Sequence, residues 1–263
     1  MSEIVYLDDE LKGFFEGTKS GRAICRYIPP KNLTKERFSN IWFSNPKVWK
    51  DPFESLFIDA SYKLNGEKGV KFRLKDRVYC LCIASDRRCE AAWKIYKCDT
   101  QFVIKKDKLI KILKANSSKY DVYIGKIRYR DESVLCTASY ETLLNEKFTS
   151  DDTSWVRLLF LKRFNYKYEE EIRIVLVAKK PNKDRRGVSL SIKCPLSDFY
   201  KLVILRPNIS SKKEQEVRAQ LTKNLKIPAE RIRKDSLYDD MKKRWSQNMN
   251  LDYKKKPMKK KRG

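Results

Sequence analysis

Residues 171–178 read EIRIVLVA, and this stretch decides the fold class. Six of its eight residues are apolar, and the β-branched ones among them are typical of a buried strand. A Pro-Asn-Lys-Asp turn at 181–184 follows, and 187–193 reads as a second strand, so we expect a hairpin. A late hairpin in place of a regular βαβ series favours an α+β fold over a doubly wound α/β fold.

Strands and helices are predicted on both sides of this stretch. The further strands are predicted at 22–28, 41–43, 77–84, 101–105, 120–129 and 201–205. The helices are predicted at 7–17, 32–39, 86–97, 139–147 and 152–164, after a cap at Asp107, and from a capping box at Ser211–Glu214 to about Leu225. In the helix over 152–164, Phe164 is expected on the core face. We therefore predict a single mixed, mainly antiparallel sheet with flanking helices over 1–240, and a basic, disordered tail over 241–263.

The net charge and the absence of histidine limit which partners the chain can bind and which catalytic groups it can use. Sixty Lys and Arg residues face 34 Asp and Glu residues, and the chain has no histidine, which gives a formal net charge of +26. Histidine-dependent triads and Cys2His2 zinc sites are therefore excluded. Residues 254–262, KKKPMKKKR, hold seven basic residues, and the rest of the chain still carries +19. Such a surface attracts polyanions, so we predict non-specific binding of nucleic acid; the alternative is a lysine-rich surface that serves solubility alone.

Several other classes of protein are not favoured. No apolar window reaches the length of a membrane span, and the N-terminus lacks the order of a secretory signal, so we expect a cytoplasmic protein without a membrane partner. Seven cysteines, an odd number, predict reduced thiols, with Cys80 and Cys82 side by side in a core and no metal site. Eight glycines without a Gly-rich phosphate loop disfavour Walker and Rossmann nucleotide binding.

The sharpest chemical cluster is YKYEEEIR at 166–173. On a strand, Glu169, Glu171 and Arg173 would share one face, and Glu170 would point to the other. A carboxylate beside an arginine can hold a substrate hydroxyl and an anionic group together. An equally weighted alternative is a solvated strand start with an ordinary Glu171–Arg173 ion pair.

Aromatic residues mark three other places. The segment 41–54, IWFSNPKVWKDPFE, could form a stacking wall with a polar floor. Arg26 and Tyr27 end the first predicted strand, and Trp93 and Tyr96 lie three apart on a predicted helix and so share a face. For each of these places the alternative is packing within the core.

Taken in order, these pieces resemble a known family. The run 41–55, IWFSNPKVWKDPFES, is similar to a signature of the bacterial and phage family called domain of unknown function 2971. Further counterparts are Arg26-Tyr27, Cys82–Ser85, Ala92–Tyr96 and Tyr168–Arg173, so the resemblance covers about residues 23–235. The chain departs from the family at Lys50, where the family has Asn, at Ile95, where it has His, and at 97–100, where it has a Gly-rich segment. The resemblance implies a setting in phage defence or mobile elements and no settled reaction.

Two functions of different classes stay open. The order of parts resembles that of compact ADP-ribosyltransferases, which implies NAD as the cofactor and an ADP-ribosyltransferase-like fold. In that reading Glu171 stabilises an oxocarbenium-like ribose and Glu169 orients the acceptor. The expected NAD-binding residues are Arg26, Tyr27, Trp42, Phe43 and Ser44; the expected substrate-binding residues are Asp51, Phe53, Glu54, Trp93, Tyr96 and Arg173.

The alternative is a non-catalytic, basic nucleic-acid-binding protein. A nuclease that holds Mg²⁺ on Asp51, Glu54, Glu169 and Glu171 is a weaker third reading, because no characteristic spacing supports it. The enzyme reading requires that Arg26, an aromatic side chain from 41–53 and Glu171 meet at one cleft.

Overall fold

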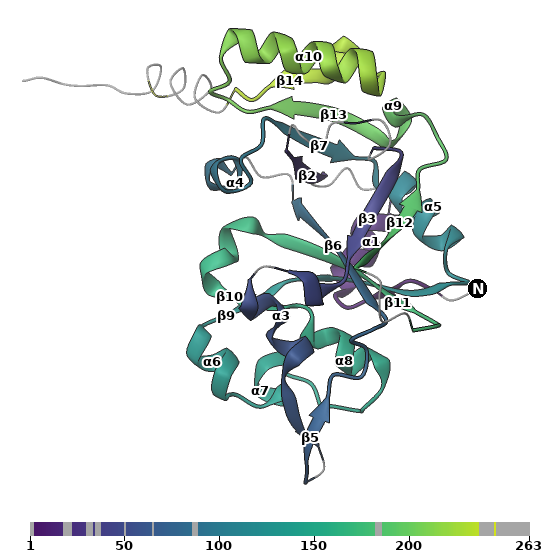
Figure 1. The fold of residues 1–263 in the computed structure, drawn as a ribbon, viewed down its shortest axis with the longest axis vertical. Coiled ribbons are helices and arrows are strands. Elements are labelled where there is room, and N and C mark those ends of the chain that lie inside the picture. Colours follow the sequence, from purple (N-terminus) through teal and green to yellow (C-terminus); the bar gives the residue numbers. More distant parts are fainter. Residues whose placement is uncertain are drawn as a thin grey trace, which may run out of the picture.

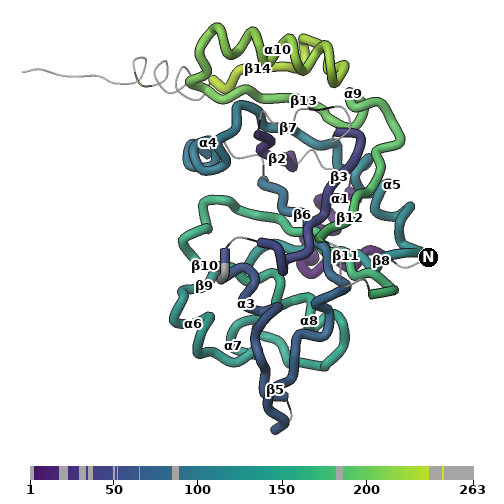
Figure 2. The backbone as a smooth tube through the Cα atoms, viewed as in Figure 1, coloured from purple at the N-terminus to yellow at the C-terminus, as the bar shows by residue number. Residues whose placement is uncertain are grey.

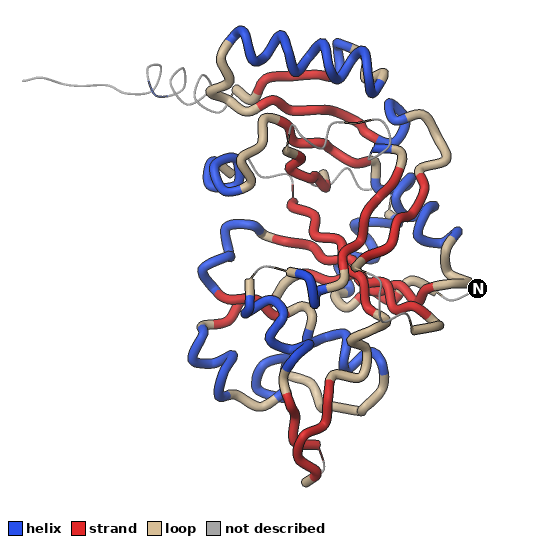
Figure 3. The backbone as a smooth tube through the Cα atoms, viewed as in Figure 1, coloured by secondary structure: helices blue, strands red, loops and turns tan. Residues whose placement is uncertain are grey.

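The computed structural model describes residues 3–17, 23–29, 34, 38–49, 51–64, 66–85, 89–181, 186–236 and 245. Among these residues, a ten-stranded sheet spans the molecule (Figures 1 and 3). Its strands follow the order β1 (Val5–Tyr6), β8 (Tyr120–Lys126), β11 (Glu171–Ala178), β6 (Val78–Ser85), β2 (Ile24–Ile28), β7 (Thr100–Ile104), β13 (Tyr200–Leu205) and β14 (Ile232–Lys234). The pair β3 (Asn40–Ser44) and β12 (Gly187–Ser191) branches from β6.

The sheet is mixed but mainly antiparallel. Within it, the β1–β8 and β13–β14 pairs are parallel, and the other pairs are antiparallel. Two small ladders lie outside this sheet: β4 (Ser61–Leu64) with β5 (Glu67–Lys71), and β9 (Arg128–Arg130) with β10 (Leu161–Arg163). With helices against the sheet, the predicted α+β class is confirmed.

Strand β11 separates two hydrophobic cores, because all eight of its residues are buried. Ile174 and its neighbours on that face contribute to a core shared with α1 (Asp9–Glu16), α5 (Lys106–Ala115) and α10 (Ser211–Leu225). Val175 and Val177 face the second core. It is covered by α3 (Pro52–Asp59), α6 (Glu132–Thr137), α7 (Tyr140–Leu144) and α8 (Asp152–Leu158), which gather at the lower end of Figure 1. The short helices α4 (Glu90–Ile95) and α9 (Leu196–Phe199) and the 3-10 turns η2 (Pro46–Val48), η3 (Phe164–Glu169) and η4 (Ala229–Arg231) complete the fold.

The sheet splits along one edge of β6. At one end of that edge, Ala84 and Ser85 pair with β2; at the other end, Cys80 pairs with Ser44 of β3. Figure 2 shows β2 near the upper end of β6, while β3 crosses near its lower end. The stretch between them, 81–83, has no strand partner on that edge among the described residues. The split leaves room for a cleft in the middle of the sheet.

The predicted hairpin of 171–178 with 187–193 is wrong. Strand β11 already pairs with β6 on one edge and with β8 on the other, so neither edge is free. Strand β12 pairs instead with β3, from Gly187 opposite Ser44 to Ser191 opposite Asn40. The turn residues 182–184 lie outside the described residues.

Several predicted boundaries also need correction. Helix α8 ends at Leu158, the chain turns into β10, and Phe164 is 48% exposed and not in the core. Lys105, not Asp107, is the N-cap of α5, and Ser210 precedes α10 and accepts a hydrogen bond from the Lys213 backbone N–H. The sequence did not predict α3, whose cap is the Asp51 carboxylate. Apart from Thr34, Phe38 and Ser39, the predicted helix 32–39 lies outside the described residues, as does the tail 241–263 apart from Trp245.

Two glycines offer a matched test of the packing between β8 and the second core. A Cβ atom at Gly125 would lie 2.7 Å from the Phe160 ring, whereas one at Gly13 in α1 would meet nothing within 4 Å. We expect Gly125→Ala to lower the free energy of unfolding by about 1–3 kcal/mol through overpacking. Gly13→Ala should raise it by about 0.5–1 kcal/mol, because alanine favours helix. Urea denaturation of both variants measures the difference; equal effects would contradict this packing.

No helix in the part of the chain that the structure describes is long and apolar enough to cross a bilayer.

Candidate functional site

A cleft of about 230 Å³ opens where β6 parts from β2 and β3. Its walls include residues 80–84 of β6 and residues from four other segments of the chain. The predicted site residues that line it are Arg26, Tyr27, Trp42, Ser44, Tyr96, Glu169 and Glu171. The required convergence of Arg26, an aromatic side chain from 41–53 and Glu171 is therefore present.

Glu171 lies at the buried end of the cleft and is held from three directions. The residue is only 4% exposed. The Arg173 Nε atom donates to Oε1 at 2.7 Å, and the Lys162 Nζ atom donates to Oε2 at 3.1 Å. The backbone N–H of Glu171 donates to the Tyr129 hydroxyl at 2.9 Å. Both carboxylate oxygens therefore have a charged partner, which fixes their direction.

Lys162 gathers three carboxylates around one ammonium group. Its Nζ atom lies 2.6 Å from Glu54 Oε1 and 2.6 Å from Glu169 Oε2, in addition to its bond to Glu171. The Nη2 atom of Arg173 lies 3.6 Å from the same Glu54 oxygen. These three carboxylates, together with Lys162 and Arg173, form the floor of the cleft. Three negative charges and two positive charges give this floor a formal net charge of −1. A low-dielectric site of this sign favours a group that carries or develops positive charge.

Two of the three carboxylates of the floor, those of Glu171 and Glu169, differ in their pKa values. Burial alone would raise the pKa of Glu171, but Arg173 and Lys162 outweigh it and lower the pKa to about 2. Burial raises the pKa of Glu169 above its ordinary value; the Lys162 ammonium opposes this shift, and Glu171 and Glu54 add to it. Glu171 is thus a fixed negative charge, and Glu169 is the better proton acceptor.

Arg26 is the cationic residue among those that line the cleft. It is half-buried on β2, and among the described residues no carboxylate forms an ion pair with it. Burial lowers the pKa of its guanidinium below the ordinary value, which is the expected direction for a charge taken from water without a partner. A half-buried arginine of this kind suits a phosphate or another anion from a ligand.

Aromatic rings form one wall of the cleft. The Tyr27 ring stacks on Tyr96, with centroids 5.4 Å apart, and meets Trp93 edge-on at 4.9 Å. Trp42 is 49% exposed on β3. A Cβ atom at Gly187 of β12 would lie 2.3 Å from the Trp42 ring, so only glycine lets that ring lie against β12. Flat rings at the mouth of a cleft can stack on a planar ligand.

Other predicted residues support the cleft without lining it. Arg163 donates to Asp51 at 3.0 Å and lies 4.0 Å over the Phe53 ring. Glu54 belongs to the floor through its ion pair with Lys162 but is not among the residues that line the cleft. Trp93 is 6% exposed and braces Tyr27 from behind. The predicted contacts of these residues with substrate stay predictions.

The solvent exposure of three residues differs from what the sequence predicted. Phe43 is completely buried in the core with α1 and α5, so it does not reach the cleft. It alternates with Trp42 along β3 and therefore faces the other side. Arg173 is 1% exposed and lies behind Glu171. Cys82 is exposed in the cleft, although Cys80 is buried as predicted, because residues 81–83 of β6 have no strand partner among the described residues on the edge opposite β11.

Lys162 and Tyr129 were not predicted as site residues, and Trp49 was predicted only as part of the aromatic segment 41–54. The Trp49 ring lies 4.8 Å from the Arg173 guanidinium, and its Nε1 atom donates to Ser44 Oγ at 2.8 Å. Lys162 fell within the overextended helix prediction, which hid its place on a strand. A helix that ended at Leu158 would have left it free to pair with the acidic run at 169–171.

The nuclease reading placed Mg²⁺ on four carboxylates. Three of them do converge, but on the Lys162 ammonium, and Asp51 pairs with Arg163. Within the described ranges, no group of three or more Cys, Asp or Glu side chains is arranged to hold a metal ion. The bonds seen at these carboxylates are those of an internal salt-bridge network.

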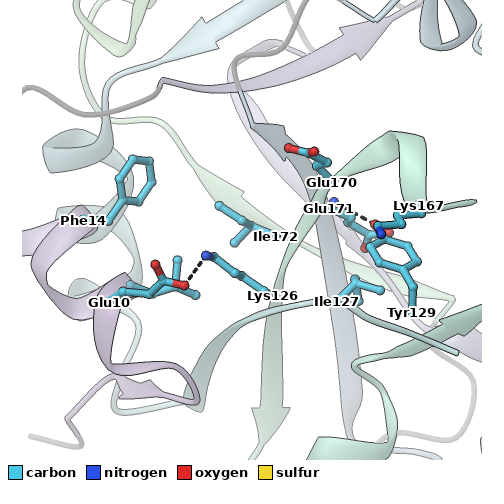
Figure 4. Close-up of a pocket in the computed structure, with 10 residues that line it drawn as sticks. Glu10, Phe14, Lys126, Ile127, Tyr129, Lys167, Glu170, Glu171 and Ile172 are labelled. Carbon is cyan, nitrogen blue, oxygen red and sulfur yellow. Dashed lines mark hydrogen bonds and ion pairs between the residues drawn. The ribbon is translucent and has the colours of Figure 1, made fainter. Parts of the chain in front are cut away.

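A second space of about 510 Å³ borders the site beside α1 (Figure 4). Glu10 and Lys126 meet across it in an ion pair, and Glu170 lies on its opposite side. Glu170 adopts a left-handed backbone conformation with φ of 40° between η3 and β11. This single strained residue places Glu169 in the cleft and Glu170 in the second space, while Glu171 borders both.

Comparisons of the chain with models of protein families, with curated proteins and with solved structures give no match. The resemblance to the domain of unknown function 2971 therefore stays a prediction.

Proposed function

We propose that the cleft binds NAD and that the protein transfers ADP-ribose from it, on an ADP-ribosyltransferase-like fold. The observation that carries this proposal is the meeting in one cleft of Arg26, which has no ion pair among the described residues, a wall of aromatic rings and an anionic floor. These three features match the three chemical parts of the cofactor: a pyrophosphate, a planar cationic ring and a ribose that develops positive charge.

Each part of NAD has a partner of suitable chemistry. The Arg26 guanidinium binds the pyrophosphate through charge-assisted hydrogen bonds. Tyr27, Trp42 or Tyr96 stacks on the nicotinamide ring, which is positively charged and so favours a π face. The cleft volume of about 230 Å³ suits the nicotinamide riboside half. The adenosine half then lies outside the cleft, along the open mouth.

The reaction follows from the charges of the floor. The bond between the ribose C1′ atom and the nicotinamide nitrogen breaks, and nicotinamide leaves with the electron pair. The ribose develops oxocarbenium character, which the fixed negative charge of Glu171 stabilises. The acceptor's nucleophilic atom forms the new bond to C1′, and its proton passes to Glu169. No histidine is needed, in keeping with the sequence.

The charge of the surface suggests the acceptor class. A net charge of +26 favours nucleic acid, or a target associated with nucleic acid, as the acceptor. We propose phage defence or a mobile element as the setting of this reaction, which is what the resemblance noted from the sequence implies. The same charge also supports the second function, non-catalytic binding of nucleic acid, which needs no cofactor.

Release of nicotinamide from NAD tests the proposal. The wild-type protein is incubated with NAD, with and without DNA, RNA or protein acceptors. We expect nicotinamide release, and we expect Arg26→Gln to raise the KM for NAD by about 10- to 150-fold, the equivalent of a lost hydrogen bond to a charged group at about 1.5–3 kcal/mol.

The matched control is Arg233→Gln, which removes the same charge from an exposed position on edge strand β14. It should leave the KM unchanged. If the wild type binds nucleic acid but releases no nicotinamide with any acceptor, the enzyme reading fails and the binding function stands.

A further inference from the structure

A third cavity, of about 430 Å³, lies among the helices at the lower end of Figure 1. Its walls come from α3, β4, α6, α7 and α8, and it shares no lining residue with the cleft. Its volume falls in the range of about 300–1,000 Å³ that is usual for small-molecule sites.

The walls of this cavity are aromatic and aliphatic. Trp155 stands at the centre of a ring cluster, with Tyr62 at 5.3 Å and Phe148 at 5.1 Å between centroids, both edge-on. Tyr140 meets Phe148 in the same way at 5.1 Å. Leucines from α3, α6, α7 and α8 supply much of the remaining surface.

The tyrosine hydroxyls are already engaged by the protein. The Tyr62 hydroxyl donates to the Phe57 carbonyl, and the Tyr140 hydroxyl donates to the Ser154 carbonyl at 3.1 Å. They therefore offer a ligand ring faces and little hydrogen bonding. A hydrocarbon matches such a surface, because it leaves no polar group of its own unsatisfied.

One end of the cavity carries positive charge. Lys63 is the charged residue among those that line it, and its side chain is exposed with no ion pair in the described part of the chain. In the β4–β5 ladder Lys63 lies directly opposite Lys68. Like charges opposite each other on paired strands are destabilising, so an anion bound there would relieve their repulsion.

We propose that this cavity binds an aliphatic carboxylate of medium chain length. The hydrocarbon chain packs against the rings around Trp155, and the carboxylate lies at the Lys63–Lys68 pair. The proposal is independent of NAD binding, because the two sites share no residue.

Calorimetric titration of the full chain with octanoate, decanoate and dodecanoate, below their micelle concentrations, tests this site. Each added methylene should tighten binding by about fourfold, as burial of a CH₂ group predicts. Decanoate should bind more tightly than decanol, and decylamine should bind least, because only the carboxylate complements the lysine pair.

Two variants and a matched control test whether the carboxylate binds in this cavity. Cys136 is exposed and lines the cavity, so Cys136→Trp should fill the space and abolish decanoate binding without disturbing a core position. Lys63→Gln should weaken binding at least fivefold, whereas Lys111→Gln on the exposed face of α5 should not. Unchanged binding in Cys136→Trp, equal losses in both lysine variants, or decylamine that binds as tightly as decanoate would overturn the proposal.

Discussion

Replacing Glu171 with Gln should lower the free energy of unfolding by about 3–5 kcal/mol, the usual cost of breaking a buried ion pair on one side. The substitution keeps the shape of the side chain but leaves the Arg173 guanidinium, 1% exposed, without the negative charge that it pairs with at 2.7 Å. It also removes one of the three carboxylates around Lys162. Urea denaturation measures the loss.

The pH dependence of this loss has a definite sign. The folded pKa of Glu171, about 2, lies below the ordinary value of 4.5, so the ionised carboxylate stabilises the folded state. That contribution is fully present above pH 4.5 and disappears as the pH falls toward 2. The gap between wild type and Glu171→Gln should therefore close over this window.

An exposed acid provides the control for this prediction. The Glu132 side chain is 58% exposed and 3.8 Å from Arg163, so Glu132→Gln should change the stability by less than about 1 kcal/mol. A Glu171→Gln variant as stable as wild type at neutral pH would mean that the network on the cleft floor is not formed. Because of its structural role, Glu171 is a poor single probe of catalysis.

Glu169 is the better probe of the reaction, and Glu169→Gln should lower the turnover of NAD by about 10²- to 10⁴-fold, the usual contribution of a general base. The KM for NAD should stay within a few-fold, since Arg26 and the aromatic wall are intact. Fold stability should change little, because burial already raises the pKa of Glu169 and makes its ionised form costly.

A pH profile separates this role from a structural one. A general base must be ionised, so the wild-type rate should rise with pH through the raised pKa of Glu169 and then level off. Glu170→Gln is the matched control: it neutralises the adjacent carboxylate, which borders the other space. It should leave the rate and its pH profile unchanged. Equal losses in the two variants would rule out a specific role for Glu169.

The sequence predicted best those features that depend only on residues close together in the chain. Strand β11 begins and ends at the predicted residues, because a stretch with six apolar residues out of eight fits a buried strand. Glu169 and Glu171 share the cleft as predicted, although a left-handed Glu170 and not a continuous strand achieves it. Trp93 and Tyr96 both contact Tyr27, which agrees with the shared face that their spacing of three residues predicted.

Features that depend on contacts between residues far apart in the chain could not be predicted from local sequence patterns. Strand β12 would pair with its neighbour in sequence if β11 had a free edge, but β8 and β6 occupy both edges. Lys162 acquires its role from Glu54, which lies more than a hundred residues earlier in the chain. The split along β6, which creates the cleft, depends on three strands and leaves no local pattern.

Equilibrium binding of NAD tests the central claim most directly. Titration of the wild type and of Arg26→Gln, followed by calorimetry at the same ionic strength, gives both stoichiometry and affinity. The account predicts one NAD per chain for the wild type and a Kd at least tenfold weaker for Arg26→Gln. No heat of binding with the wild type, or the same Kd in both proteins, would contradict it.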